Sequence, residues 1–298
     1  MTLGRPSAVV TVDGRRLTSA EGAVVRVRVR LGRGPAHDDA ECICWLSSKL
    51  ASASAGSTLA IALGNAGDET DVWTGEVTGV RRAPDGLALE GLAASVALSR
   101  TFLSQTFVDL SIADVVQQLA SAAGAEVEEA SGDATLSAYA VDDRRSAWAH
   151  LNDLAELAGA EVTVTETGAL KFVAPPPPAG GGLGGLVEQG AALVFGGGAS
   201  GLRYGANLLG WRATTRKAPD TASVAAYGAA SESGSAKWHW IRRDPDAAGS
   251  GPARIVPAFR TRDAAGALAD ALATRAARAV RRATVVVVGD AKIGRAHV

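Results

Sequence analysis

The chain is poor in aromatic residues, in net charge and in long apolar runs. Aromatic side chains make up 5% of its 298 residues, and the formal net charge is −1. No apolar run approaches the roughly 20 residues that a membrane helix needs, and the N-terminus lacks the apolar core of a signal peptide. The near-neutral charge gives the molecule no overall attraction for nucleic acid or acidic membranes. We therefore expect a globular protein with no membrane segment and no nucleic-acid partner.

The only two cysteines, Cys42 and Cys44, are two residues apart. This spacing puts both on one face of a strand and suits a mutual disulfide poorly, so a reducing compartment is expected. His37 lies close enough in sequence to suggest a metal site. Zinc normally takes four ligands, however, and the chain has no second pair to complete the set. We interpret the cysteines as small buried apolar residues beside a loop histidine, and we expect no metal.

Sequence motifs of the commonest hydrolases and nucleotide-binding proteins are also missing. The chain has no phosphate-loop Gly-Lys-Ser/Thr, no Gly-x-Ser-x-Gly and no His-Glu-x-x-His. Gly180, Gly182 and Gly185 fit the pattern G-x-G-x-x-G, but four prolines precede them where a dinucleotide-binding loop needs a strand. These glycines are interpreted as part of a linker, and no cofactor is expected.

Four further polar residues are candidates for a functional site. His150 falls within a predicted helix and is expected on the helix surface or at an interface. His239 lies between two tryptophans on a predicted strand, which favours core packing. Asp142 and Asp143 are adjacent, so they would point to opposite sides of a strand or across a turn, a poor arrangement for an acid/base pair. The sequence thus predicts no catalytic residue and no enzyme activity.

Strands and turns dominate the first hundred residues. The stretch "VVTVDGRRL" is typical of a hairpin that turns at Asp13-Gly14. The stretch "AVVRVRVRLG" alternates strictly, which predicts a strand with one apolar and one basic face. The residues expected to pack inward are Val25, Val27, Val29 and Leu31. The basic face would carry a row of three arginines, Arg26, Arg28 and Arg30.

Two similar phrases follow, "SIADVVQQLASAAGAEV" from Ser111 and "SAWAHLNDLAELAGAEV" from Ser146. Each begins with a serine that can cap a helix, continues with apolar residues at helical spacing, and ends in Gly-Ala-Glu-Val. Gly124 and Gly159 stand where a left-handed residue usually ends a helix. Each phrase therefore predicts a short amphipathic helix that feeds a strand. The second of these strands turns at Thr167-Gly168 and returns.

The remainder begins with "APPPPAGGGLGG", a linker or exposed loop. Strands with Gly/Ser-rich loops follow, then a long helix capped by Thr261 and a buried strand "TVVVVGD" whose sheet partner is missing. Arg275, Arg278 and Arg282 are expected on one side of this helix, as a solvated or protein-contacting face. The last seven residues, "KIGRAHV", match the translated start of a common sequencing adapter, so we expect them to be a scar.

Together these patterns predict an α+β, mainly β fold, with two β-barrel or sandwich domains and a helical insert between them. The predicted parts are a first β domain at residues 1–100, the helical insert at 101–174, a Pro/Gly-rich linker at 175–190, an incomplete second β domain at 191–291, and the scar at 292–298.

The order of these pieces resembles the phage late-control D protein, the baseplate hub of contractile tails, and is similar to the N-terminal part of VgrG spike proteins. The resemblance covers residues 7–291. It rests on Gly75 in an aromatic-started strand, on "SIADVV" (111–116), on "WAHLNDLAELAGAEV" (148–162) and on "GALKF" (168–172). His150, where the family prefers a large apolar residue, and the missing Pro-Gly end are departures.

This resemblance implies a structural hub subunit that joins the tail tube to the spike. It implies two tube-like β domains with an inserted small α/β module, and a homotrimer assembled in the bacterial cytoplasm and then located in a virion tail or an injection-system baseplate. From the alternating strand itself we expect Arg26, Arg28 and Arg30 at a subunit or tube contact. The alternatives are a tail-associated cell-wall hydrolase, or a carbohydrate- or protein-binding β module. The last would require Trp211, Trp238 and Trp240 to be exposed in a groove.

Overall fold

The computed structural model describes residues 5–32, 34–84 and 86–174 and shorter segments after them. Those later segments are 193–194, 201–202, 208–215, 225–229, 241–243, 253–255, 262–279 and 281–287. Several sequence predictions fall outside the described residues: the linker of 175–190, the scar of 292–298, Gly180, Gly182, Gly185, Trp238, His239 and Trp240.

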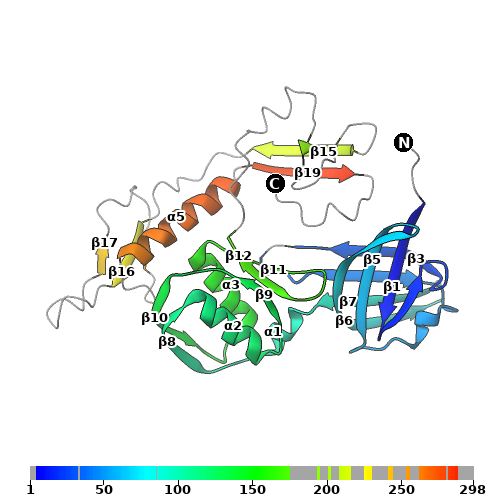
Figure 1. Ribbon diagram of the computed structural model, residues 1–298, viewed down its shortest axis with the longest axis horizontal. Helices are drawn as coiled ribbons and strands as arrows, with labels where there is room; N and C mark the ends of the chain where they lie inside the picture. Colours follow the sequence, from blue (N-terminus) through cyan, green and yellow to red (C-terminus); the bar gives the residue numbers. More distant parts are fainter. Residues whose placement is uncertain are drawn as a thin grey trace.

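Residues 6–93 form one antiparallel sheet of seven strands, which curls on itself (Figure 1). Its strands are β1 (Pro6–Val12), β2 (Arg15–Thr18), β3 (Val24–Arg30), β4 (Asp39–Cys44), β5 (Thr58–Asn65), β6 (Asp68–Ala83) and β7 (Gly86–Ala93). A 3-10 helix, η1 (Lys49–Ser52), follows β4. The strand order is β2-β1-β5-β6-β7-β4-β3, so β2 and β3 are the end strands.

Turn residues set the register of the first hairpin at the position that the sequence predicts. Asp13 and Gly14 join β1 to β2 with positive φ angles of 47° and 76°, the left-handed pair that a tight hairpin turn requires. The Asp13 carboxylate also accepts a hydrogen bond from the Thr58 backbone N–H at 2.8 Å. The first hairpin is therefore fixed to the start of β5 as well as to itself.

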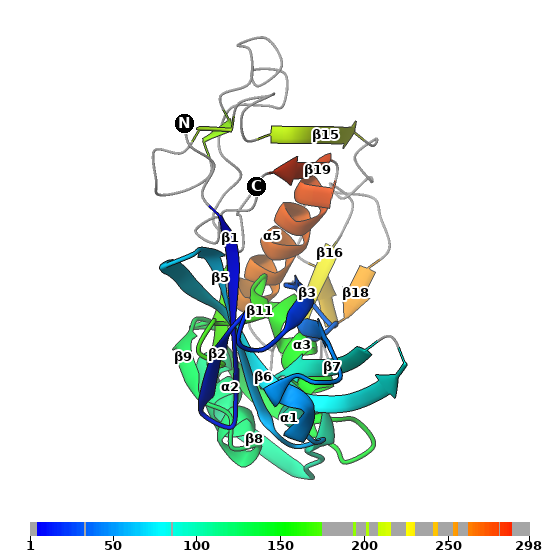
Figure 2. The same ribbon diagram turned by 90° about the vertical axis from the view of Figure 1, so that its right-hand side faces the viewer.

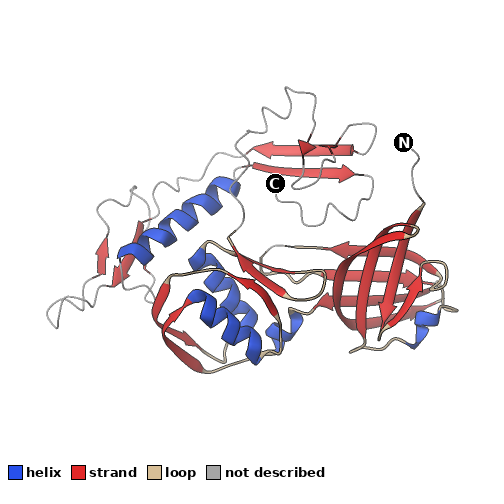
Figure 3. Cartoon of the chain, viewed as in Figure 1, coloured by secondary structure: helices blue, strands red, loops and turns tan. Residues whose placement is uncertain are grey.

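A compact module follows the sheet and carries most of the helices (Figure 3). Its elements are α1 (Val96–Arg100), β8 (Gln105–Ser111), α2 (Ile112–Ala122), β9 (Val127–Ala130), β10 (Thr135–Val141), α3 (Ala147–Ala158), β11 (Glu161–Val164) and β12 (Leu170–Val173). Strands β8 and β10 form an antiparallel pair, and the other three form a sheet in the order β11-β12-β9. The sequence patterns predict two helices and the strands that follow them in this region, but they do not predict the pair β8–β10.

Both repeated phrases form the predicted helices. Ser111 caps α2 by accepting a hydrogen bond from the Asp114 backbone N–H at 3.1 Å, and Ser146 caps α3 in the same way through the Ala149 N–H at 3.3 Å. The chain turns left-handed just after each helix, at Gly124 (φ 67°) and Gly159 (φ 65°).

The strands that leave these two helices belong to one sheet. β9 follows α2, β11 follows α3, and β12 lies between them, antiparallel to β11 and parallel to β9. The repeated phrase thus marks the two helix-to-strand corners of a single module and is no tandem array.

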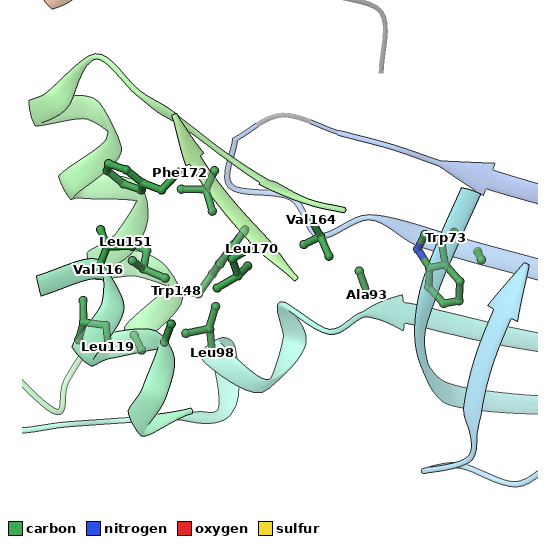
Figure 4. Packing of buried hydrophobic residues seen from close by; sticks show 14 of the residues in the cluster. Trp73, Ala93, Leu98, Val116, Leu119, Trp148, Leu151, Val164, Leu170 and Phe172 are labelled. Carbon is green, nitrogen blue, oxygen red and sulfur yellow. The ribbon is translucent and has the colours of Figure 1, made fainter. Parts of the chain in front are cut away.

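One continuous buried cluster connects the first sheet with the module (Figure 4). Trp73 and Ala93 belong to the sheet, Val164 and Leu170 to the small sheet of the module, and Leu151 to α3. Because the cluster runs across residue 100, the packing gives no sharp limit there, and the predicted domain limits stay a prediction.

A long helix, α5 (Arg262–Ala279), packs on the module beside α3, and its Leu268 is buried there. Figures 1 and 2 show β15 (Leu208–Thr215) and β19 (Arg281–Val287) as an antiparallel pair beyond the end of this helix. The other described strands are β13 (Leu193–Val194), β14 (Gly201–Leu202), β16 (Ala225–Ala229), β17 (Ile241–Arg243) and β18 (Ala253–Ile255).

Two predictions for this region were wrong. The helix ends at Ala279, so Arg282 lies on β19 and does not share a helix face with Arg275 and Arg278. The final strand has a partner, β15, and Val286 on it is exposed instead of buried. The β-branched residues of this stretch favour a strand, which begins three residues earlier than expected.

Candidate functional site

The three arginines of β3 form an exposed row on the outer face of the first sheet. Their neighbours on β4 lie directly opposite: Arg28 faces Glu41, and Arg30 faces Asp39. Cys42, opposite Val27, points into the core, so the arginines point away from it. We call Arg26, Arg28 and Arg30 the arginine row.

Acidic residues of β4 neutralise most of this row. Arg30 binds Asp39 through Nε and Nη2, with three N–O distances of 2.6–3.0 Å, and this bonding raises the pKa of the Arg30 guanidinium. The Glu41 carboxylate lies 3.0 Å from Arg26 and 3.5 Å from Arg28, and its side chain is only 14% exposed. Because the three arginines are 51–65% exposed, we expect each ion pair to stabilise the fold by only about 0–1 kcal/mol.

The apolar side of this strand differs from the prediction. Val27 and Val29 pack against the core as expected, but Val25 is 57% exposed and Leu31 also faces solvent. The pairing with β4 shifts between Val24 and Arg26, which makes Val25 the extra residue of a β-bulge. A bulge interrupts the strict alternation of faces, so Val25 turns outward beside the arginines.

An apolar patch that the sequence patterns do not predict lies beside the arginine row. Trp45 is 58% exposed and Leu46 is also exposed, and both follow β4 directly. The Trp45 backbone N–H donates to the Ala23 carbonyl at 3.0 Å, which places this residue beside the start of β3. Tryptophan and arginine are the residues most enriched at the centres of protein interfaces. Two large apolar residues placed directly after a strand, ahead of a Ser-Ser turn, were the available signal.

The loop between β3 and β4 fixes this edge to the helical module. His37 lies between two serines, with Nδ1 2.8 Å from Ser95 Oγ and Nε2 2.7 Å from Ser99 Oγ. Its ring packs against Trp148, with a centroid distance of 4.7 Å, and the Trp148 indole N–H donates to the Pro35 carbonyl at 2.7 Å. Burial lowers the pKa of His37, which favours its neutral form in this position.

His37 therefore does not join the cysteines in a metal site. Cys42 and Cys44 are both free and fully buried on the inner face of β4, as the sequence predicted. In the part of the chain that the structure describes, no group of three or more His, Cys, Asp or Glu side chains is placed to hold a metal ion.

Burial raises the pKa of the Cys42 thiol to about 12, with a smaller contribution from Cys44. The folded pKa lies above the ordinary value of 9.0, so the stability that this thiol contributes is complete below pH 9 and is lost as the pH rises towards 12. We expect native protein at pH 8 to react slowly with Ellman's reagent, and guanidinium-unfolded protein to release two equivalents at once. Rapid labelling of the native protein would contradict the assigned burial.

His150, which the sequence predicts on the helix surface or at an interface, is not on the surface but buried within the module. Its ring meets Tyr139 edge-on, with centroids 6.1 Å apart, and its Nε2 lies 3.2 Å from the Asp142 carbonyl. The residue sits on the core side of α3, next to Leu151 and Leu154. It therefore occupies a position for a large apolar residue while a backbone oxygen satisfies its nitrogen.

Asp142 and Asp143 lie in an exposed turn after β10. Asp142 binds Arg144 at 3.0 Å, and this hydrogen bond lowers the pKa of the Asp142 carboxyl. The pair does not form an acid/base arrangement.

Trp211 is exposed on β15. No described helix is long and apolar enough to cross a membrane.

Known proteins resemble this chain in structure. No family model matches it, and no curated protein matches it in sequence. A 43 kDa tail protein of prophage MuSo2 from Shewanella oneidensis matches with a TM-score of 0.61 at 11% identity, over 95% of this chain and 83% of that one. A tail protein from Neisseria meningitidis MC58 matches with a TM-score of 0.61 at 14% identity, over 96% and 81%.

A looser likeness is to a Francisella PdpA–VgrG complex, with a TM-score of 0.46 at 6% identity, over 85% of this chain and 40% of that one. The likeness to the two tail proteins confirms the predicted mainly β, α+β fold and, at the level of the fold, the resemblance to tail proteins. The chain has the fold of phage tail proteins.

Proposed function

We propose that the chain is a structural subunit of a baseplate hub, which joins the tail tube to the spike in a contractile phage tail or a phage-derived injection system. The observation that carries this proposal is a fold shared with two tail proteins along 95% and 96% of the chain. In this proposal the protein is a homotrimer that assembles in the bacterial cytoplasm and then resides in the tail, and its role is structural instead of catalytic.

The arginine row is proposed as the contact with a neighbouring subunit or with the tube. It is exposed, regular and close to Trp45 and Leu46, a combination of charge and apolar area that suits a protein contact. Neither alternative function has a comparable observation in its favour. Asp142 is engaged by Arg144, and Trp211 is the only one of the three candidate tryptophans within the described residues.

Replacing Arg26, Arg28 and Arg30 together by glutamine tests the role of this row. Glutamine is preferred to glutamate, because glutamate would gather five carboxylates around Glu41 and Asp39. We expect the thermal midpoint to change by only a few degrees, since the ion pairs are exposed, while the yield of complex with tail tube protein falls at least tenfold. Light scattering and co-purification with tube and spike proteins give the two measurements.

The matched control replaces three exposed arginines elsewhere on the sheet, Arg15, Arg16 and Arg81, by glutamine. Equal assembly by both triple variants would show that the row is merely solvated. Wild-type protein that stays monomeric and binds neither tube nor spike would overturn the hub proposal itself.

A further inference from the structure

Besides the edge of β2, two strand edges of the first sheet have no strand neighbour within the described residues. β3 pairs only with β4, so its other edge is unpaired. β6 is long and changes neighbours: it pairs with β5 from Asp68 to Glu76, whereas its pairing with β7 begins at Gly75. The first part of β6, residues 68–74, therefore has β5 on one side and, in the described part of the chain, no strand on the other. Open edges of this kind can pair with another chain.

These two edges carry opposite charge on the same face. Glu69 and Asp71 lie opposite Gly64 and Ala62 of β5. Leu59 and Ile61 of β5 are core residues and Leu63 packs against the core, so the alternate positions 62 and 64 belong to the outer face of that strand. The acidic residues thus lie on the outer face, as the arginine row does. We call Glu69 and Asp71 the acidic pair.

The spacing of the two sets also agrees. Neighbouring arginines of the row are two residues apart, as are the members of the acidic pair, and each step corresponds to about 7 Å along a strand. Asp71 is exposed. Arg28 is held less tightly than its neighbours, at 3.5 Å from a carboxylate that Arg26 binds at 3.0 Å. It is the member of the row best able to accept a second acidic partner.

We propose that the β3 edge of one copy pairs with the first part of β6 in a second copy, so that the arginine row meets the acidic pair of its neighbour. The inference rests on the proposed hub function and deepens it by naming the contact between subunits. Each copy then offers one basic and one acidic edge, a head-to-tail arrangement that can close into a ring.

Charge argues against two other pairings of the β3 edge. Two β3 strands placed edge to edge would bring two arginine rows together. The edge of β2, the other end strand, carries exposed Arg15 and Arg16 and is basic as well. Like charges directly opposite one another in a sheet are destabilising, so the first part of β6 is the edge that complements β3. Such charges mainly set the choice of partner and the rate of association.

A cysteine pair in the full-length chain tests this contact. The variant Arg28→Cys/Asp71→Cys is treated with a short bis-maleimide and run on a denaturing gel. We expect a ladder of covalent multimers, because each copy carries both reactive edges. Each single variant should give no ladder, since Cys42 and Cys44 are fully buried. The control Arg28→Cys/Glu129→Cys places its second thiol on the exposed part of β9, away from both edges, and should also give none.

A second variant keeps the test independent of cross-linking geometry. Asp71→Lys should raise the dissociation constant of self-association at least tenfold in sedimentation experiments, with the thermal midpoint preserved. Glu69 is left in place, because its carboxyl is hydrogen-bonded to Ser7 within the same chain. Wild-type oligomers without a ladder from the cysteine pair, or with unchanged affinity in the lysine variant, would overturn this contact and leave the hub proposal standing. Efficient dimers from Arg28→Cys alone would show β3 facing β3. Wild-type protein that neither self-associates nor binds the tube would overturn both proposals.

Discussion

Substitution of Gly75 by alanine is expected to prevent the first sheet from forming. A Cβ at this position would lie 2.7 Å from the ring of Trp73 and would overlap the backbone carbonyl of Leu92. Trp73 is buried in the core, and the carbonyl belongs to the neighbouring strand, so neither can move away without breaking the pairing of β6 with β7. We expect a loss of more than about 4 kcal/mol in the free energy of unfolding, which only severe core defects produce.

The same strand supplies the control. At Gly79 an added Cβ would meet the end of the Glu90 side chain at 3.3 Å, and that exposed side chain can turn aside. Gly79→Ala should therefore melt within a few degrees of wild type, whereas Gly75→Ala should be insoluble or unfolded by circular dichroism. A Gly75→Ala protein that is soluble and melts like wild type would show that Trp73 is not packed as described.

Substitution of Gly159 by alanine is expected to release α5 from the module. Gly124 and Gly159 end the two repeated phrases with nearly the same left-handed φ, 67° and 65°, so alanine costs about 1–2 kcal/mol of backbone strain at either position. Their surroundings differ. At Gly124 an added Cβ meets nothing within 4 Å, whereas at Gly159 it would lie 2.6 Å from the Ala271 Cβ on α5.

The comparison of the two variants separates strain from collision. Both should lower the free energy of unfolding of the module by a similar amount, but only Gly159→Ala should increase amide hydrogen exchange across Arg262–Ala279. Equal exchange of α5 in the two variants would contradict the packing of this helix against the end of α3. Leu268, which is buried, offers a second probe. Leu268→Asp should release the same helix while every residue of the module itself stays unchanged.

Local signals in the sequence were sufficient for most elements of the first 174 residues. Ser111, Ser146, Gly124 and Gly159 act on the residues next to them, so their capping and terminating roles could be predicted from spacing alone. The bulge at Val25 could not be predicted in this way, because it depends on the register between β3 and β4. The burial of His150 likewise depends on Tyr139 and Asp142, which reach it through tertiary packing.

In the candidate site, too, local sequence predicts some features, whereas others depend on strand pairing. Alternation made the arginine row visible, but the partners that neutralise it, Glu41 and Asp39, became apparent only once the register of β4 was known. No local pattern in the sequence marks the acidic pair on β6. Its significance depends on where the pairing with β7 begins, and that is set by Gly75 and the close approach of two strands.

The arrangement of β12 has a consequence for the order in which the module can fold during synthesis. β12 is the last strand of the module along the chain and also its central strand. It joins β9, which was made some forty residues earlier, since Leu170 pairs with Val127. In a nascent chain that has emerged only as far as α3, β9 therefore lacks its strand partner in this sheet. The sheet then closes through contacts of long sequence separation, which form slowly. Until residue 173 leaves the ribosome, the two helices pack over an unfinished sheet.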